Sequence, residues 1–254
     1  MGNPIDSAIR IGRRYWFVDG FTEMLAGGLF VMLGGVLLLR GMAPQGSFLA
    51  QFASIASDIG LIKVFGLLAA GLILWWLKDR FTYPRTGFVR EKRVTVVQIL
   101  TFLRNAILCL LLPVLALVAA FFFLPSMRAF LFSMPVWSPV AMSTIWAVLC
   151  ILSGHWLGLR RFVLLGVLIL LAGTGISAWQ LAAGLPPIPV EALQSSPLAA
   201  LPEALRAPLA EILNRAFVSI GWLTLVSGAI FAISGMVTFL RYRMENPVPY
   251  KEEA

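Results

Sequence analysis

Six apolar stretches, each long enough to cross a lipid bilayer, constrain this chain more than any other feature of its sequence. A helix needs about 20 mostly apolar residues to span the hydrocarbon core. The stretches cover residues 21–39, 59–77, 96–124, 136–159, 162–183 and 216–240. Charged residues make up 13% of the 254-residue chain, about half the share in soluble domains. The sequence therefore predicts an all-α integral membrane protein, a six-transmembrane-helix bundle that forms a single membrane domain.

The 20 Lys and Arg residues are distributed unevenly over the connections between these stretches. Most lie before the first span, in the loop 78–95, at Arg160–Arg161 and in the C-terminal tail. The opposite side carries Arg40, Arg128, Arg206 and Arg215. Because cytoplasmic loops of membrane proteins are enriched in Lys and Arg, both termini are expected in the cytoplasm. We expect the protein in the plasma membrane, which is the inner membrane of a bacterium.

The net charge of +8 does not indicate a nucleic-acid-binding protein. Such proteins gather their basic residues on one face or stripe, whereas here they separate the apolar stretches. The excess positive charge is expected to contact the anionic headgroups of membrane lipids.

Glycines recur every seven residues in two of the six stretches. A seven-residue period keeps these positions on one face of a helix that crosses its neighbour with a left-handed twist. Glycine lets two backbones approach closely, which is how helices gain contact in lipid. We therefore predict helix packing along both stripes, either within the bundle or at the seam of an oligomer. The first stripe comprises Gly20, Gly27, Gly34 and Gly41, with Gly28 and Gly35 alongside, and the second comprises Gly221, Gly228 and Gly235.

Charged residues inside the apolar stretches are candidates for function, because a charge at membrane depth is costly. Glu23 lies near the start of the first stretch, and Arg104 lies about 13 Å into the third. Both are expected in the cytoplasmic half of the membrane, so we predict that they form an ion pair. Such a pair would fix the order of the helices or bind an anionic headgroup or solute. His155, the one histidine, is a candidate for a proton relay or for a hydrogen-bonded packing group.

Two segments on the expected outer side are predicted to lie along the membrane surface. The proline-rich loop 184–214 contains Leu201, Leu205, Leu209 and Ile212 at spacings of three and four residues, typical of an amphipathic helix. A connector without regular structure is the alternative for this loop. Residues 48–55 are predicted to form a second, short interfacial helix before the second span.

The cytoplasmic loop 78–95 contains the string Tyr83-Pro84-Arg85-Thr86-Gly87-Phe88-Val89. This string resembles the Tyr-Pro-Arg-x-Gly-Tyr/Phe-Val loop of a loose group of uncharacterised prokaryotic multi-pass membrane proteins. The resemblance covers the loop and the preceding span, and it implies a shared structural element without any catalytic residue or substrate. Tyr83 and Arg85 are candidates for binding anionic lipid or a soluble partner, with topology alone as the alternative role of the loop's charge.

The sequence contains no His-Glu-x-x-His motif, no phosphate-binding glycine loop and no acidic metal cluster, and it indicates no particular cofactor. Its spans are rich in packing motifs, which favours a non-catalytic membrane subunit or scaffold. Such a protein would act through helix packing with protein partners in a membrane complex or with further copies of itself. A carrier of a small or lipid-like solute is the alternative, motivated by Glu23 and Arg104. An intramembrane enzyme is a third hypothesis, which rests on Arg104 and His155.

The topology predicts opposite accessibility for two engineered cysteines in a chain whose Cys109 and Cys150 are replaced by alanine. In intact cells, Ser195→Cys should react with a membrane-impermeant maleimide, because residue 195 is expected outside. Thr86→Cys should react only after the membrane is permeabilised, because residue 86 is expected in the cytoplasm. Labelling is read as a mass shift on a gel, and the reverse pattern would sink the six-span assignment with cytoplasmic termini.

Overall fold

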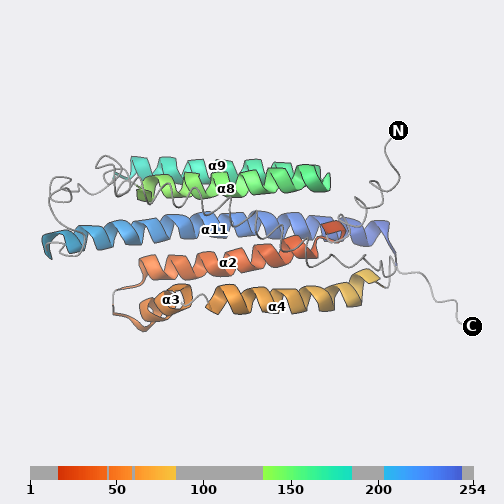
Figure 1. Ribbon diagram of the computed structural model, residues 1–254, viewed down its shortest axis with the longest axis horizontal. Helices are drawn as coiled ribbons and strands as arrows, with labels where there is room; N and C mark the ends of the chain where they lie inside the picture. The colour runs from red at the N-terminus through yellow and green to blue at the C-terminus, as the bar shows by residue number, and fades with distance from the viewer. Residues whose placement is uncertain (1–16, 45, 59–60, 84–133, 185–202, 248–254) are drawn as a thin grey trace, which may run out of the picture. The chain divides into compact units, whose positions relative to one another are not determined.

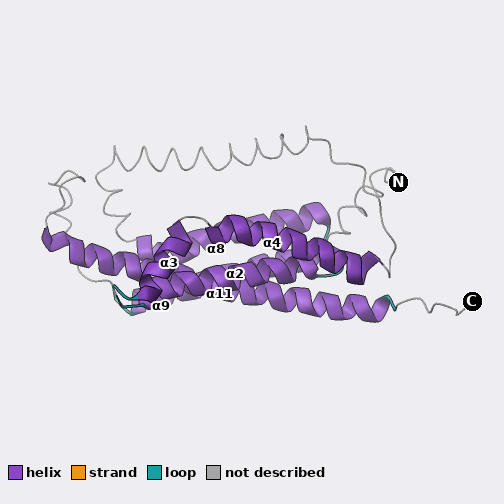
Figure 2. Cartoon of the chain, turned by 90° about the horizontal axis from the view of Figure 1, so that it is seen from below, coloured by secondary structure: helices purple, strands orange, loops and turns teal. Residues whose placement is uncertain are grey.

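The computed structural model describes residues 17–44, 46–58, 61–83, 134–184 and 203–247, and the regular structure in these ranges is helical (Figures 1 and 2). The predicted all-α class is thus confirmed for this part of the chain. Internal contacts divide the chain into two compact units, residues 1–88 with 135–184 and 213–254, and residues 89–134 with 185–212. All contacts described below lie within the first unit.

Among the described residues, four helices are long and apolar enough to cross a membrane. They are α2, α9, the segment Val136–His155 of α8 and the segment Ala210–Glu245 of α11. Even the 20-residue segment of α8 extends about 30 Å, which is the thickness of the hydrocarbon core. These helices indicate a membrane protein. In chain order the elements are α2 (Phe21–Met42), α3 (Phe48–Asp58), α4 (Leu61–Leu77), η1 (Lys78–Thr82), α8 (Met134–Leu157), α9 (Arg160–Ala182) and α11 (Glu203–Glu245).

The predicted spans correspond to these elements with one gap. The first, fourth, fifth and sixth coincide with the four membrane-length helices, and the second coincides with α4, which has 17 residues. The chain continues from α4 directly into η1, a five-residue π-helix, where the sequence predicts the start of a loop. The third predicted span, residues 96–124, lies outside the described residues, so the count of six remains a prediction.

The corner between α8 and α9 lies at Gly158 and Leu159, just before the two arginines that mark it in the sequence. Gly158 has a φ of 66°, a left-handed conformation that glycine adopts without steric cost. The Leu159 N–H donates to the carbonyl of Gly154 at 2.8 Å, and the Gly158 N–H donates to that of His155 at 3.2 Å. This pair of bonds is a common way to end a helix. Arg160–Arg161 therefore form the first turn of α9 and not the turn itself.

α11 begins earlier than the sixth predicted span. The predicted outer loop 184–214 is helical from Glu203 onward, so its final part is no separate surface helix. The physical reason lies in the apolar spacing, because the pattern of Leu209 and Ile212 continues at intervals of four residues into Ala216 and Ile220. No glycine interrupts this run to end the helix.

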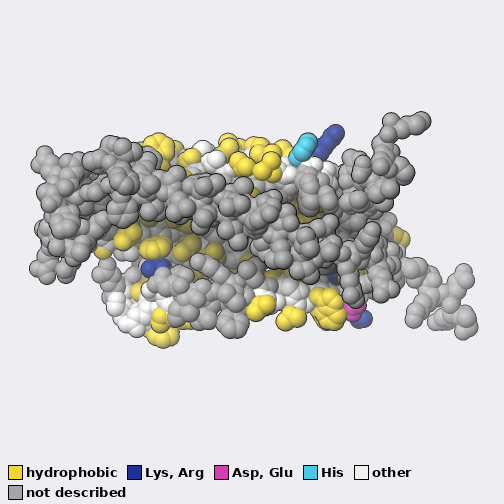
Figure 3. Space-filling view, in the orientation of Figure 1, with side chains coloured by type: hydrophobic (Ala, Val, Ile, Leu, Met, Phe, Trp, Pro, Cys, Tyr) yellow, Lys and Arg dark blue, Asp and Glu magenta, His cyan; other side chains and the backbone are white. Residues whose placement is uncertain are grey.

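Large apolar side chains lie exposed along the outside of the helices. Examples are Leu72 on α4, Leu152 on α8, Leu164 on α9 and Val237 on α11. Figure 3 shows hydrophobic side chains along the edges of the visible face. Exposed apolar surface of this extent is unfavourable in water but is the normal exterior of a helix bundle in lipid.

The two glycine stripes face each other across α2 and α11, which run antiparallel. A Cβ atom placed on Gly27 would lie 2.6 Å from the Gly228 carbonyl oxygen, and one placed on Gly228 would lie 2.7 Å from the Gly27 carbonyl oxygen. Real Cβ atoms essentially never come so close to another backbone, so these positions require glycine. We call this contact the glycine seam. Its pairs are Gly20 with Gly235, Gly27 with Gly228, and Gly34 with Gly221.

The second glycine face of α2 has a different environment. Cβ atoms placed on Gly28 and Gly35 would meet nothing within 4 Å. The nearby Val31 and Met32 are 39% and 43% exposed. Of the two adjacent stripes on α2, one is therefore the helix contact and the other is open in the described part of the structure.

The glycine seam predicts opposite effects for alanine at two neighbouring positions. Gly27→Ala should lower the free energy of unfolding by about 1–3 kcal/mol, because the new methyl group must push α11 away. Gly28→Ala is the matched control and should be neutral or stabilise by about 0.5–1 kcal/mol, because alanine is the better helix former. Unfolding by sodium dodecyl sulfate in mixed micelles measures both. Equal effects of the two substitutions would contradict the seam.

Candidate functional site

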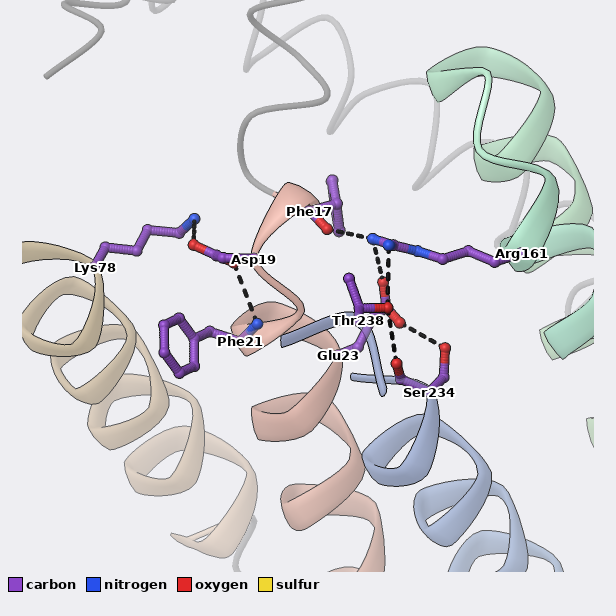
Figure 4. Close-up of polar contacts among 8 residues, drawn as sticks. All are labelled: Phe17, Asp19, Phe21, Glu23, Lys78, Arg161, Ser234 and Thr238. Atoms are coloured by element: carbon purple, nitrogen blue, oxygen red, sulfur yellow. Dashed lines mark hydrogen bonds and ion pairs between the residues drawn. The ribbon is translucent and has the colours of Figure 1, made fainter. Parts of the chain in front are cut away.

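Two carboxylates lie one turn apart where the chain enters α2 (Figure 4). Asp19 precedes the helix and is 0% exposed, and Glu23 lies in its first turn and is 2% exposed. Asp19 accepts a hydrogen bond from the Phe21 N–H at 3.2 Å, which satisfies one of the free N–H groups at the start of the helix. Buried carboxylates need further partners, because burying an unpaired charge is very costly.

Asp19 receives its partners from η1. Its Oδ2 atom lies 2.7 Å from the Lys78 Nζ and accepts a hydrogen bond from the Thr82 hydroxyl at 2.8 Å. Lys78 is 1% exposed, so both charges of this ion pair are removed from solvent. A buried pair is tolerated when its geometry is good and extra hydrogen bonds satisfy its atoms, as Thr82 does here.

The π-helical turn carries both of these partners. Lys78 and Thr82 are its first and last residues, four positions apart, and they point to the same carboxylate oxygen. π-Helical turns are rare and are frequently found at functional sites. The backbone stays helical through Tyr83, whose N–H donates to the Lys78 carbonyl. This continuation holds the Lys78 side chain beside α2.

Glu23 receives its partners from α9 and α11. Its Oε1 atom lies 2.7 Å from the Arg161 Nη2 atom, and its Oε2 atom accepts a hydrogen bond from the Ser234 hydroxyl at 2.8 Å. The Glu23 side chain is 1% exposed and that of Arg161 is 27% exposed. The ion pair therefore joins a fully buried carboxylate to a guanidinium at the rim of the site.

Arg161, in the first turn of α9, contacts three other segments of the chain. Besides Glu23, it donates from Nη1 to the Thr238 hydroxyl of α11 at 3.1 Å and from Nη2 to the carbonyl oxygen of Phe17 (Figure 4). The planar guanidinium supports this because it presents several N–H groups in fixed directions. One side chain thereby connects α2, the residues before α2, α9 and α11.

Aromatic rings surround the two ion pairs. Phe21, between Asp19 and Glu23 in sequence, lies 4.8 Å from Phe239 of α11 and 6.0 Å from Phe81 of η1, measured between ring centroids. Phe17 meets Phe162 of α9 edge to face at 5.4 Å. These rings exclude water, which strengthens the attraction within each ion pair and raises the cost of leaving either charge without a partner.

The structure brings together only some of the residues predicted from the sequence. Glu23 lies in the ion-pair network, and Tyr83 follows η1 and is half-buried. His155 is exposed in the last turn of α8. Arg104 and Arg85 lie outside the described residues, so the predicted Glu23–Arg104 pair remains a prediction, whereas Arg161 is the partner the structure shows.

Sequence reasoning assigned no site role to Lys78, Thr82, Arg161 or Thr238. In the sequence, Lys78 and Arg161 each stand where an apolar stretch ends or begins, a position typical of charges that set membrane topology. One available signal was that Lys78 and Thr82 are four residues apart and so share a helix face. The second was that Arg161 and Glu23 are expected at the same side of the membrane.

The network contains two carboxylates and two cations, so its formal charges cancel. Its contacts join α2 to η1, α9 and α11, and each is an ion pair or a charge-assisted hydrogen bond of a kind that fixes geometry. Among the described residues, no group of three or more His, Cys, Asp and Glu could hold a metal ion. The arrangement is therefore suited to holding helices in register.

A double-mutant cycle tests the ion pair of Glu23. Glu23→Gln should lower the free energy of unfolding by about 2–3 kcal/mol, because Arg161 then loses its charge partner in a mostly buried position. The double variant Glu23→Gln with Arg161→Gln should lose less than the sum of the single losses, by about 1 kcal/mol or more. Glu245→Gln, which removes an exposed pair with Arg241, is the control and should have no measurable effect. Additive losses would mean that Glu23 and Arg161 are not coupled.

Comparisons with models of protein families, with curated proteins and with solved structures found no match for this chain. The resemblance of the loop around Tyr83 therefore remains a prediction.

Proposed function

We propose that this chain is a non-catalytic integral membrane subunit or scaffold that acts through helix packing with protein partners. The observation that carries the proposal is that the buried charges of the described residues are engaged in contacts between segments of the bundle. Asp19 binds Lys78, and Glu23 binds Arg161. Carriers and enzymes need polar groups that face a substrate, whereas charges that neutralise each other inside a bundle fix which helices are neighbours.

The proposal includes six spans, cytoplasmic termini and the bacterial inner membrane as location. Support comes from the end of the first unit where α2 begins. At this end, the contacts of Lys78 and Arg161 hold the end of α4, the start of α9 and the last turns of α11 close to the start of α2. These are the segments in which the sequence concentrates its basic residues, as expected for a cytoplasmic face. Exposed Arg241 and Arg243 at this end of α11 would meet anionic lipid headgroups.

The open glycine face of α2 is the proposed contact for a protein partner. Gly28 and Gly35 lie seven residues apart, and Val31 and Met32 between them are exposed. A second helix placed on such a face gains close backbone contact in the same way as α11 does on the glycine seam. A homo-oligomer would use the same face of each copy.

Co-purification with a face-specific variant tests the scaffold hypothesis. The tagged chain at native expression level is extracted from membranes with its surrounding lipid, and partners are quantified by mass spectrometry. We expect a stoichiometric protein chain or a second copy of this chain. The double variant Gly28→Leu with Gly35→Leu should lose it without a lower free energy of unfolding, because the new side chains occupy the partner's position.

Gly71→Leu is the matched control, because Gly71 is an equally open glycine on α4. It should retain the partner. A chain that purifies alone, or with a tightly retained lipid or solute only, would contradict the scaffold hypothesis, and a retained solute would favour the carrier. A partner that survives the double variant would leave the scaffold hypothesis intact but place the contact on another face.

A further inference from the structure

The short helix α3 presents three different surfaces around its axis. Residues spaced three and four apart share a side of a helix. Phe48, Phe52 and Ile55 form one side by this spacing, and Ala53 with Ala56 lies on a second. Gln51 and Ser54 lie on a third side, which is polar. The sequence of α3 is thus amphipathic, and its apolar part is wide enough to cover two neighbouring sides.

The alanine side packs against the bundle. Ala53 is 0% exposed and Ala56 is 8% exposed, and they form a buried apolar cluster with Val36 of α2. Their small side chains let α3 lie close to α2. This contact fixes the rotation of α3 about its own axis, so the directions of the other two sides follow from it.

The aromatic side points away from the bundle. Phe48, Phe52 and Ile55 are 78%, 53% and 54% exposed. A buried aromatic or branched side chain contributes about 1.5–3 kcal/mol relative to an exposed one, so three exposed together in water would be a considerable loss. Residues 48–57 carry no charged side chain that would favour water or an oppositely charged protein surface.

The place of α3 in the chain indicates what covers this side. α3 follows α2, whose 22 residues extend about 33 Å, close to the thickness of the hydrocarbon core. The ion-pair network lies at the start of α2, so α3 lies at the opposite boundary of the membrane. Leu39 and Met42 near the end of α2 and Leu68 of α4 are exposed apolar residues of the helices on either side of α3 in the chain.

We propose that α3 is an interfacial helix whose Phe48, Phe52 and Ile55 side docks into the hydrocarbon edge of the lipid leaflet. The polar side with Gln51 faces the headgroups and water, and the alanine side holds α2. The inference rests on the proposed membrane placement of α2. Lipid is favoured over a protein because the side is uncharged and lies where α2, which is long enough to span the membrane, reaches the membrane boundary.

Site-directed spin labelling of the full chain in phospholipid bilayers tests this inference. Single cysteines replace Phe52, Ile55, Gln51 or Leu72 in a background in which Cys109 and Cys150 are alanine. Oxygen dissolves in hydrocarbon, whereas a water-soluble nickel chelate does not enter it. We expect the ratio of oxygen to nickel collision rates to be several-fold higher at positions 52 and 55 than at position 51.

Position 72, on the exposed side of α4, separates this inference from the membrane placement itself. A high ratio of oxygen to nickel collision rates at position 72, together with frequent nickel collisions at positions 52 and 55, would overturn the docking of α3. It would leave the membrane placement of the spans intact. Low access to both reagents at 52 and 55 would show that protein covers this side and would also overturn it. Nickel access at 72 would overturn the membrane placement on which the inference rests.

Discussion

The close contact between the backbones of α2 and α11 is the constraint on which the rest of the site depends. Lipid supplies no hydrophobic force between helices, so van der Waals contact and polar bonds must hold them together. The glycine seam supplies the first and makes the second possible. Ser234, next to Gly235 of the seam, reaches Glu23 because nothing larger than hydrogen separates the two backbones there. One turn further along α11, the Thr238 hydroxyl accepts a hydrogen bond from Arg161 of α9, so the same stretch of α11 contacts both partners of the ion pair.

The helix dipoles explain why the four charges are not equivalent. Glu23 lies in the first turn of α2, where a negative charge is favoured, and Lys78 follows the C-terminal end of α4, where a positive charge is favoured. Arg161 lies in the first turn of α9, the unfavourable end for a cation. Its stability in that position therefore depends on Glu23 and on the carbonyl of Phe17.

The sequence predicts those features of the structure that depend on a single helix, such as its position in the chain and the residues on its contact face. The apolar stretches located α2, α8 and α9, and the seven-residue glycine period marked the stripes that form the seam. It was uninformative about the partner of Glu23, because membrane depth says nothing about which helices are neighbours, and Arg104 and Arg161 both satisfied the depth criterion. The role of Lys78 was missed for another reason. The apolar run ends at Leu77, and a π-helical turn that continues the helix leaves no mark in hydropathy.

The contacts of α2 divide its surface in a way that favours a scaffold over a carrier. One side is held by α11 through the glycine seam, the start is held by ion pairs, and Val36 packs on α3. Phe30 stacks on Trp146 of α8 with ring centroids 4.8 Å apart. A helix held by backbone contacts and ion pairs cannot shift without breaking several of them together, whereas alternating access requires one group of helices to move against another. The open side with Gly28 and Gly35, the proposed contact for a partner helix, belongs to a helix that is held in this way on its other sides.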